Sequence, residues 1–391
     1  MDAPLIDVLL GGGERADRVT HLEHIPAREA EHADWPGWAD PGLVGGYRRL
    51  GVDRPWRHQV IAADAAWSGR HTVLATSTGS GKSLAFWLPA LSAVRAGTED
   101  ATATPGRIEG SRRRPSVLYL CPTKALAADQ VNGLHRLLAE AAITDVRVAT
   151  CDGDTETTER RWVREHADVV LTNPDFLHFS LLPGHTRWSR LLRGLRYVVV
   201  DESHAFRGVF GAHVAAVLRR LRRLAAYYGA SPTFVLASAT TSDPEASAAR
   251  LVGLPPDDVV AVTEDTSPRG RKTFALWEPP LLPGQPPVLG TRETSDQPET
   301  PLSPTHRTAT AEMADLLADL VVAGARTLAF TRSRRAAESV AATTRDHLDD
   351  VGPGRPARRA AGVRRTRLLD DLRRRLRLQV EQRLLGDLHQ P

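Results

Sequence analysis

The feature that most constrains this chain is an apolar run followed directly by a loop of small residues and then by an apolar helical pattern. Residues 71–76 are typical of a buried strand, residues 77–83 read STGSGKS, and residues 84–91 read LAFWLPAL. Glycines let the backbone curl so that its N–H groups converge on phosphate oxygens at the start of a helix. The order strand, loop, helix therefore predicts a phosphate-binding loop at the edge of an α/β sheet.

Two side chains of this loop carry the expected chemistry. Lys82 is expected to reach the terminal phosphates of a nucleoside triphosphate, and the hydroxyl of Ser83 to hold Mg²⁺. The strict pattern has glycine five residues before Gly81, where this chain has Thr76. The alternative is a glycine-serine turn before a core helix, which does not explain why Gly-Lys-Ser stands between a strand and a helix. The loop predicts ATP and Mg²⁺ as cofactors.

A second apolar run, residues 197–200, ends in an acidic pair. Asp201 and Glu202 follow it directly, and His204 comes three residues after Asp201. Two carboxylates at the end of a buried strand cost free energy unless a cation lies beside them. A Mg²⁺-bound triphosphate supplies that cation, so we expect Asp201 to bind the metal and Glu202 to polarise the attacking water. His204 can couple the nucleotide to a later motif. The alternative is a solvated acidic turn.

Composition excludes other classes of site and partner. The chain has two cysteines, Cys121 and Cys151, too few for a disulfide framework or a four-cysteine metal site. No apolar run is long enough for a membrane span, and a cytoplasmic protein is expected. The net charge of +4, from 51 basic and 47 acidic residues, is too small to indicate nucleic acid by itself. The only lysines are Lys82, Lys124 and Lys272, whereas arginine is abundant. Lysine at these positions favours roles that need a compact ammonium group rather than the broad guanidinium of arginine.

Apolar runs alternate with amphipathic patterns along the chain. Such alternation predicts right-handed crossovers and a parallel sheet, with ligands at the carboxyl ends of its strands. Loops are expected at residues 97–115, 279–310 and 352–360, which lack apolar periodicity. Strands are expected at residues 71–76, 116–121, 146–150, 168–172, 197–200, 233–237 and 326–331, and helices at 56–67, 83–95, 125–141, 156–165, 212–228 and 311–323.

Further short strings make the chain resemble superfamily 2 DExH-type (DEAD/DEAH-box) helicases. Residues 122–130 (PTKALAADQ), 172–175 (TNPD) and 238–240 (SAT) look like motifs Ia, Ib and III in the expected order. Residues 151–155 (CDGDT) and 206–214 (FRGVFGAHV) are similar to the bacterial YprA (MrfA) branch, which is related to the eukaryotic Hrq DNA-repair helicases. The resemblance implies an α/β fold in which a parallel-sheet RecA-like P-loop NTPase domain is followed by a second such domain.

The resemblance also implies roles for matching residues. Gln59 is similar to a glutamine that reads adenine, and Ser238 and Thr240 look like residues that couple hydrolysis to strand movement. Four residues resemble those that contact the nucleic-acid backbone in this family: Thr123, Lys124, Thr172 and Asn173. The full set implied for nucleotide binding is Gln59, Thr78, Gly79, Ser80, Gly81, Lys82 and Ser83.

The implied partner is single-stranded nucleic acid, and the resemblance favours DNA over RNA. Backbone contacts of this kind carry little sequence preference. A cytoplasmic, nucleoid-associated protein follows from that partner, and no membrane partner is expected. The predicted domains are an N-terminal extension at residues 1–49, the RecA-like ATP-binding domain at 50–270, a flexible linker at 271–310 and a partial second RecA-like domain at 311–391.

The chain departs from the family in its last part. Residues 326–335 look like motif IV, but no later string matches motif V or a motif VI of the Q-x-x-G-R-x-G-R kind, which suggests a truncated or frame-shifted tail. Motif VI supplies arginines to the triphosphate, and such arginine fingers are worth about 10³–10⁵ in rate. We therefore expect an ATP-dependent repair-type helicase whose unwinding is impaired in this chain. The alternatives are a non-catalytic ATP- and nucleic-acid-binding module and, less compatible with these strings, an unrelated phosphate-loop enzyme.

Overall fold

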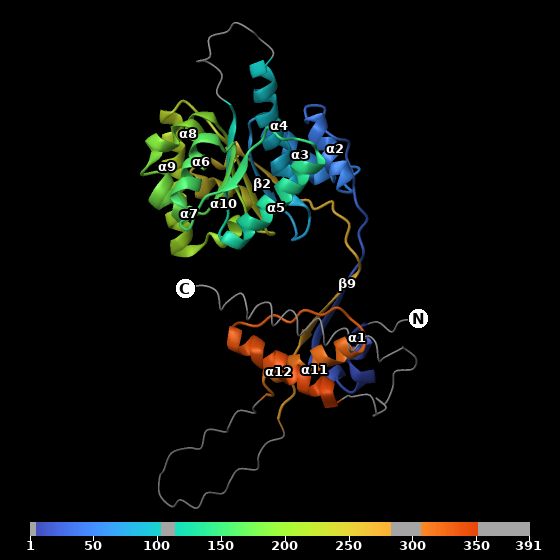
Figure 1. Cartoon of the computed structure of the whole chain (residues 1–391). Coiled ribbons are helices and arrows are strands. Elements are labelled where there is room, and N and C mark those ends of the chain that lie inside the picture. Colours follow the sequence, from blue (N-terminus) through green and yellow to red (C-terminus); the bar gives the residue numbers. More distant parts are fainter. Residues whose placement is uncertain (1–4, 103–113, 283–305, 351–391) are drawn as a thin grey trace, which may run out of the picture. The chain divides into compact units, whose positions relative to one another are not determined.

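The computed structural model describes residues 5–102, 114–282 and 306–350. All of the expected loop at 352–360 and most of the expected loops at 97–115 and 279–310 lie outside them, and residues 97–102 are helical instead. Contacts divide the chain into two units. The sheet unit is Ala27–Gly270, and the ribbon unit combines Met1–Pro26 with Arg271–Pro391. Each unit is described by itself (Figure 1).

The sheet unit is built on seven parallel strands in the order β4-β5-β3-β6-β7-β2-β8. The predicted parallel α/β sheet is confirmed, and six of its strands lie where the sequence indicated them. The strand that was not predicted is β8, a short run after a polar turn. The bounds are β2 (His71–Ala75), β3 (Ser116–Leu120), β4 (Val148–Thr150), β5 (Val169–Thr172), β6 (Leu195–Val200), β7 (Thr233–Ser238) and β8 (Val259–Val262).

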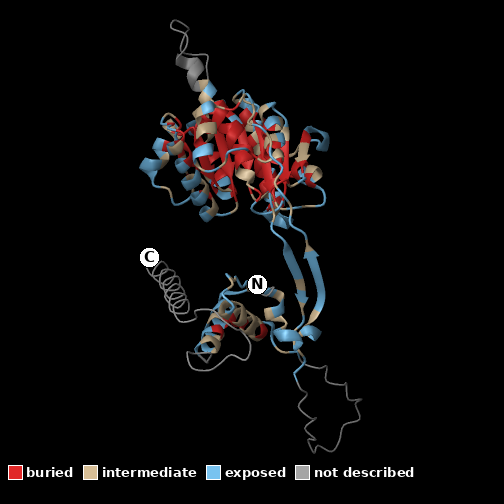
Figure 2. Cartoon of the chain, turned by 90° about the vertical axis from the view of Figure 1, so that its right-hand side faces the viewer, coloured by how far each residue is buried: buried red, intermediate tan, exposed pale blue. Residues whose placement is uncertain are grey.

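Helices cover both faces of this sheet (Figure 1). Neighbouring strand residues alternate between two apolar clusters: Val117 and Tyr119 belong to one, and Leu118 and Leu120 to the other. Both clusters are buried, as the red interior in Figure 2 shows, which explains why the strands are continuous apolar runs. The first face carries α2 (Pro41–Arg49), α3 (Arg57–Trp67), α4 (Lys82–Thr102) and α5 (Lys124–Glu140), and the second α6 (Thr157–His166), α7 (Pro174–Phe176), α8 (Ser189–Gly194), α9 (Gly208–Tyr227) and α10 (Pro244–Val252).

The ribbon unit contains a two-stranded antiparallel sheet of β1 (Val19–Ile25) and β9 (Lys272–Trp277), most of whose side chains are exposed (Figure 2). Its helices are α1 (Leu5–Leu9), α11 (Ala309–Val322) and α12 (Arg334–Asp350). Buried Glu312 on α11 accepts hydrogen bonds from Arg18, Arg307 and the Trp277 indole. Burial opposes ionisation of Glu312, but these bonds outweigh it and lower its pKa.

The structure differs from the sequence-based expectations in further places. Residues 326–331 are not a strand: neither sheet of the described residues contains them, and Leu328 and Phe330 are each 83% exposed. An isolated apolar run cannot form a strand without a partner for its backbone groups. Strand β9 lies in the expected linker, and α2 lies in the expected N-terminal extension. The assignment of residues 311–391 to a partial second RecA-like domain stays a prediction.

Close packing of α2 against α5 generates a stability prediction. A Cβ atom added at Gly46 would lie 2.8 Å from the Cβ of Ala141 and 3.0 Å from its backbone. Gly46→Ala should therefore lower the free energy of unfolding by about 1–3 kcal/mol, the usual cost of overpacking. Gly133→Ala on exposed α5 surface, with no atom within 4 Å, is the matched control. It should gain up to about 1 kcal/mol from helix propensity. Equal urea midpoints for the two variants would contradict the predicted packing.

Candidate nucleotide-binding site

The loop between β2 and α4 has the backbone shape that the sequence indicated. Gly79 and Gly81 take positive φ angles of 83° and 62°, and α4 begins at Lys82. A Cβ at Gly81 would lie 2.5 Å from Gln59 Nε2 and 2.9 Å from the Trp56 ring. Only glycine fits there, for conformational and steric reasons together. Beside Gly79 no atom lies within 4 Å of such a Cβ, so that side of the loop is open.

Polar contacts within the loop explain its departure from the strict phosphate-loop pattern. The hydroxyl of Thr76, which stands where glycine was expected, is 2.7 Å from the hydroxyl of buried Ser80. Lys82 folds back and donates through Nζ to the carbonyl oxygens of Thr76, at 3.3 Å, and Ser77, at 3.0 Å. The ammonium is therefore held against the loop by weak contacts that a stronger anionic acceptor can replace.

Gln59 joins helix α3 to the same loop. Its Oε1 accepts from the backbone N–H of Trp56 at 2.9 Å, and its Nε2 donates to the carbonyl of Gly81 at 2.8 Å. One lone pair and one N–H of the amide stay available. Gln59 lines a pocket of about 470 Å³, in which Tyr47 and Trp56 stand beside polar and charged side chains. Aromatic rings beside an amide that can donate and accept suit the edge of a purine base.

The acidic pair lies at the end of β6, where Asp201 is buried and held by two hydrogen bonds. Its Oδ2 accepts from the Tyr119 hydroxyl at 2.6 Å and its Oδ1 from the backbone N–H of Glu202 at 2.8 Å. Burial raises the pKa of Asp201, whereas these hydrogen bonds and the charge of Lys82 oppose the rise. Strands β2 and β6 both pair in parallel with β7, so the phosphate loop and the acidic pair lie at the same edge of the sheet.

Glu202 and His204 form the part of the site that faces the next strand. Glu202 takes a left-handed φ of 48°, a strained conformation of the kind found at functional sites. His204 Nδ1 lies 3.1 Å from Glu202 Oε2 and 3.2 Å from the backbone nitrogen of Ala239. One ring nitrogen cannot satisfy both: protonated, it donates to Glu202, and unprotonated, it accepts from Ala239. His204 can therefore exchange partners between the acidic pair and the end of β7.

Strand order brings the predicted coupling residues between the loop and the acidic pair. Strand β7 lies between β6 and β2 in the sheet, and buried Ser238 is its last residue. Thr240 follows two residues later and is exposed. Ser203 Oγ donates to the carbonyl of Ala237 at 3.0 Å, which joins the acidic turn to this strand end.

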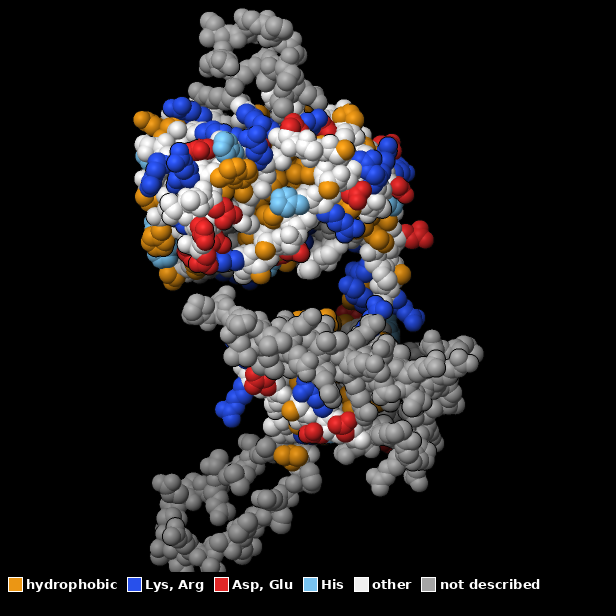
Figure 3. Space-filling model, viewed as in Figure 1, with side chains coloured by type: hydrophobic (Ala, Val, Ile, Leu, Met, Phe, Trp, Pro, Cys, Tyr) orange, Lys and Arg blue, Asp and Glu red, His pale blue; other side chains and the backbone are white. Residues whose placement is uncertain are grey.

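The four residues expected to grip nucleic acid line one pocket of about 170 Å³, together with Asp152. Thr123 and Asn173 also cap helices α5 and α7 through their side-chain oxygens. Lys124 forms ion pairs with Asp154 and, at 3.9 Å, with Asp152. The buried hydroxyl of Thr172 has no hydrogen-bonding partner within the described part of the chain. Over the face shown in Figure 3, basic and acidic side chains of the sheet unit are interspersed.

Donor chemistry at the site fits a nucleotide-borne metal ion better than a protein cage. No group of three or more His, Cys, Asp or Glu side chains in residues 5–102, 114–282 and 306–350 could hold a metal ion. The Ser83 hydroxyl and the Asp201 carboxylate are hard oxygen donors of the kind Mg²⁺ takes alongside phosphates. Among the same residues, no helix has the length and apolar character of a membrane span.

Sequence reasoning missed Tyr119, which it treated only as part of an apolar strand. A tyrosine inside a fully buried strand needs a partner for its hydroxyl, and that need was the available signal. The ring stacks on Trp87 with a centroid separation of 5.4 Å, which directs the hydroxyl to Asp201. Arg28, His58 and Asp265, near the phosphate loop, were also missed.

Loss of the Tyr119 hydroxyl should leave Asp201 under-satisfied. We predict that Tyr119→Phe lowers the free energy of unfolding by about 1–3 kcal/mol, the cost of an unpaired buried polar group. Tyr197→Phe is the control, because this buried hydroxyl donates to the carbonyl of Ala66 at 3.3 Å rather than to a carboxylate. Urea unfolding of both variants measures the difference, and a larger loss for Tyr197→Phe would show that the Asp201 contact is unimportant.

Known proteins resemble this chain over most of its length. The ATP-dependent helicase YprA of Bacillus subtilis is 35% identical over 318 residues, and the ATP-dependent helicase hrq1 of Schizosaccharomyces pombe is 32% identical over 330. These matches include 81% and 84% of this chain but only 38% and 28% of the two relatives. A crystal structure of the helicase MrfA bound to DNA and AMPPNP matches 88% of this chain and 43% of its own, at 32% identity and a TM-score of 0.73.

The protein family described as DEAD/DEAH box helicase matches residues 56–248, the stretch that carries Gln59, the phosphate loop, the acidic pair and the end of β7. The parallel sheet and the order of its motifs agree with that match. Residues 56–248 therefore form a domain of the DEAD/DEAH box helicase family.

Proposed function

We propose that the sheet unit binds ATP·Mg²⁺ at the loop of residues 77–83 and hydrolyses it in response to single-stranded DNA. The observation that carries this proposal is the curl of the loop at Gly79 and Gly81, at the same edge of the parallel sheet as buried Asp201. The helicase MrfA, described as bound to DNA and AMPPNP, has the same fold at 32% identity. A DNA partner also implies that the protein acts at the nucleoid.

Each residue of the proposed site has a physical role. The amides of Gly79 to Lys82 and the ammonium of Lys82 bind phosphate oxygens, and the free lone pair and N–H of Gln59 face the base. Magnesium, when bound with the nucleotide, neutralises charge on the phosphates. Ser83 and Asp201 supply oxygens for that metal. Glu202 orients the attacking water. His204 can bond either to Glu202 or to the backbone at the end of β7, and this change of partner couples hydrolysis to Ser238 and Thr240.

The pocket at Thr123, Lys124, Thr172 and Asn173 is proposed to hold the nucleic-acid backbone. A buried hydroxyl without a partner and a lysine with exchangeable acidic partners are both suited to phosphate oxygens. We expect little base preference.

We further propose that a polypeptide of these 391 residues unwinds DNA poorly. Its sequence has no match to motif VI, the source of arginines that stabilise charge on the triphosphate. The segment resembling motif IV carries exposed Leu328 and Phe330 and is not part of a sheet in the described residues. ATP hydrolysis measured with and without single-stranded DNA separates a slow ATPase from a non-catalytic binding module, and robust strand displacement would contradict the proposal.

Nucleotide binding can be tested at two residues with separable roles. Lys82→Ala should weaken Mg·ATP binding about 10- to 100-fold, the value of one charge-assisted hydrogen bond. Glu202→Gln should keep affinity but lower single-turnover hydrolysis about 10²- to 10⁴-fold. Lys272→Ala removes an exposed lysine of the ribbon unit and is the control. Titration calorimetry and a phosphate-release assay measure both effects, and unchanged affinity of Lys82→Ala would refute the assigned site.

The Lys124 pocket can be tested through salt dependence. Lys124→Ala should weaken single-stranded DNA binding and reduce the slope of log affinity against log salt by about 0.7, the value of one phosphate contact. Asp154→Asn should tighten binding up to about fivefold, because it removes an exposed ion pair that competes for Lys124. Asp257→Asn, an exposed carboxylate after α10, is the control. Fluorescence anisotropy at several salt concentrations is the measurement, and an unchanged slope for Lys124→Ala would exclude this contact.

A further inference from the structure

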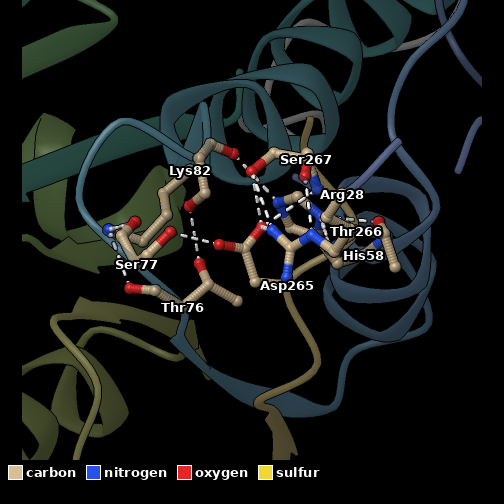
Figure 4. A network of polar contacts seen from close by, with 9 residues as sticks. Arg28, His58, Thr76, Ser77, Lys82, Asp265, Thr266 and Ser267 are labelled. Atoms are coloured by element: carbon tan, nitrogen blue, oxygen red, sulfur yellow. Dashed lines mark hydrogen bonds and ion pairs between the residues drawn. The ribbon is translucent and has the colours of Figure 1, made fainter. Parts of the chain in front are cut away.

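A network of polar side chains outside the helicase motifs holds the phosphate loop from one side (Figure 4). Its centre is Asp265, in the segment after β8. Asp265 Oδ2 accepts from the hydroxyl of Ser77, the first residue of the loop. Asp265 Oδ1 accepts from the N–H of Ser267 at 3.0 Å and from its hydroxyl at 2.6 Å, and lies 3.0 Å from Arg28 Nη2. Every strong contact of this carboxylate is thus with a donor that belongs to the loop or to its support.

A second attachment lies three residues further along the loop. The ring of buried His58 contacts the carbonyl of Ser80 through Nε2 at 2.9 Å. A carbonyl only accepts, so Nε2 carries the proton and Nδ1 is the acceptor. Nδ1 faces both the N–H and the hydroxyl of Thr266, at 3.2 Å and 2.8 Å. Burial lowers the pKa of His58, which keeps the ring in this neutral form.

Both attachments lead to the same support. Asp265 and Thr266 are adjacent, and the chain continues to Arg269, whose backbone pairs with that of Arg28 through two hydrogen bonds of 2.8 Å. Arg28 Nε also donates to the carbonyl of Ser267 at 2.9 Å. The support is therefore a closed set of contacts between the two ends of the sheet unit, and the phosphate loop is fixed to it at Ser77 and at Ser80.

Neighbouring donors stabilise the negative charge of Asp265. Burial opposes its ionisation, but hydrogen bonds from Ser267, Ser77 and Arg28 outweigh burial and hold its pKa well below its ordinary value. The group is a carboxylate at any physiological pH. An uncompensated carboxylate beside a triphosphate would weaken binding, and the ion pair with Arg28 removes that penalty.

We propose that Asp265 is a positioning residue of the nucleotide site: it fixes Ser77 so that the loop is already curled for phosphate before the nucleotide arrives. The inference rests on the proposed nucleotide-binding function and adds a residue that no helicase motif in this chain contains. Asp265 touches no reacting atom in this role. Without its acceptor, ordering of the loop would have to accompany binding, and the affinity for Mg·ATP would fall about tenfold, the cost of ordering one residue.

The test compares two changes at one position. Asp265→Ala and Asp265→Asn both remove the negative charge, but only the asparagine can still bond Ser77: its oxygen accepts from Ser267 and Arg28, and its NH2 donates to the Ser77 hydroxyl. We expect Asp265→Ala to weaken Mg·ATP binding about tenfold and Asp265→Asn to bind within about threefold of the original chain. Ser77→Ala should lower the affinity for Mg·ATP as much as Asp265→Ala does. The double variant should bind no more weakly than either single variant, because the contact between Ser77 and Asp265 is lost in all three. Asp257→Ala is the control for removal of a nearby exposed carboxylate.

Titration calorimetry with Mg·ATP and Mg·ADP gives the affinities, and urea unfolding of each variant checks stability. Equal loss in the alanine and asparagine variants, tighter binding in both, or multiplied losses in the double variant would overturn the proposal. If Asp265→Ala fails to fold, Ser77→Ala, a change of an exposed side chain, decides it. Original affinity in Asp265→Ala together with weak binding in Lys82→Ala would reject only this inference, whereas original affinity in Lys82→Ala would reject the nucleotide site itself.

Discussion

Burial of one carboxylate at the end of a parallel strand shapes the site of this protein. Asp201 is removed from water, and burial alone would favour its neutral form. It is held as an acceptor by the Tyr119 hydroxyl, by the backbone of Glu202 and by the charge of Lys82. Tyr119 comes from the neighbouring strand β3, so β3 and β6 must be in register for the site to exist. The apolar clusters on both faces fix that register.

The phosphate loop depends on support from outside its own sequence. Glycine at position 81 is required by Gln59 and Trp56 as much as by its φ angle, and Ser77 and Ser80 are held by Asp265 and His58. Preorganisation of this kind lowers the entropy lost on binding. The same principle explains why residues near the ends of the sheet unit, far from the motifs in the sequence, lie beside the nucleotide loop (Figure 4).

Much of the fold could be predicted because strands covered on both faces are continuous apolar runs. The predicted nucleotide residues also followed from local patterns at strand ends. Tyr119, Asp265 and Arg28 could not be predicted in this way, since their partners lie 82, 188 and 237 residues away or belong to segments without periodicity. A strand was wrongly predicted at residues 326–331. An apolar run forms a strand only beside a neighbouring strand, and the described residues contain no such neighbour for it.

The proposed site would hold a triphosphate against the amides of Gly79 to Lys82, with Ser83 and Asp201 supplying oxygens for its metal. A crystal structure of this chain with Mg²⁺ and a non-hydrolysable ATP analogue tests it most directly. We expect phosphate oxygens at the N-terminus of α4, the Lys82 ammonium moved from the loop carbonyls to the phosphates, and metal density within reach of Ser83 and Asp201. Nucleotide bound elsewhere, or a loop that stays empty at saturating concentration, would contradict it.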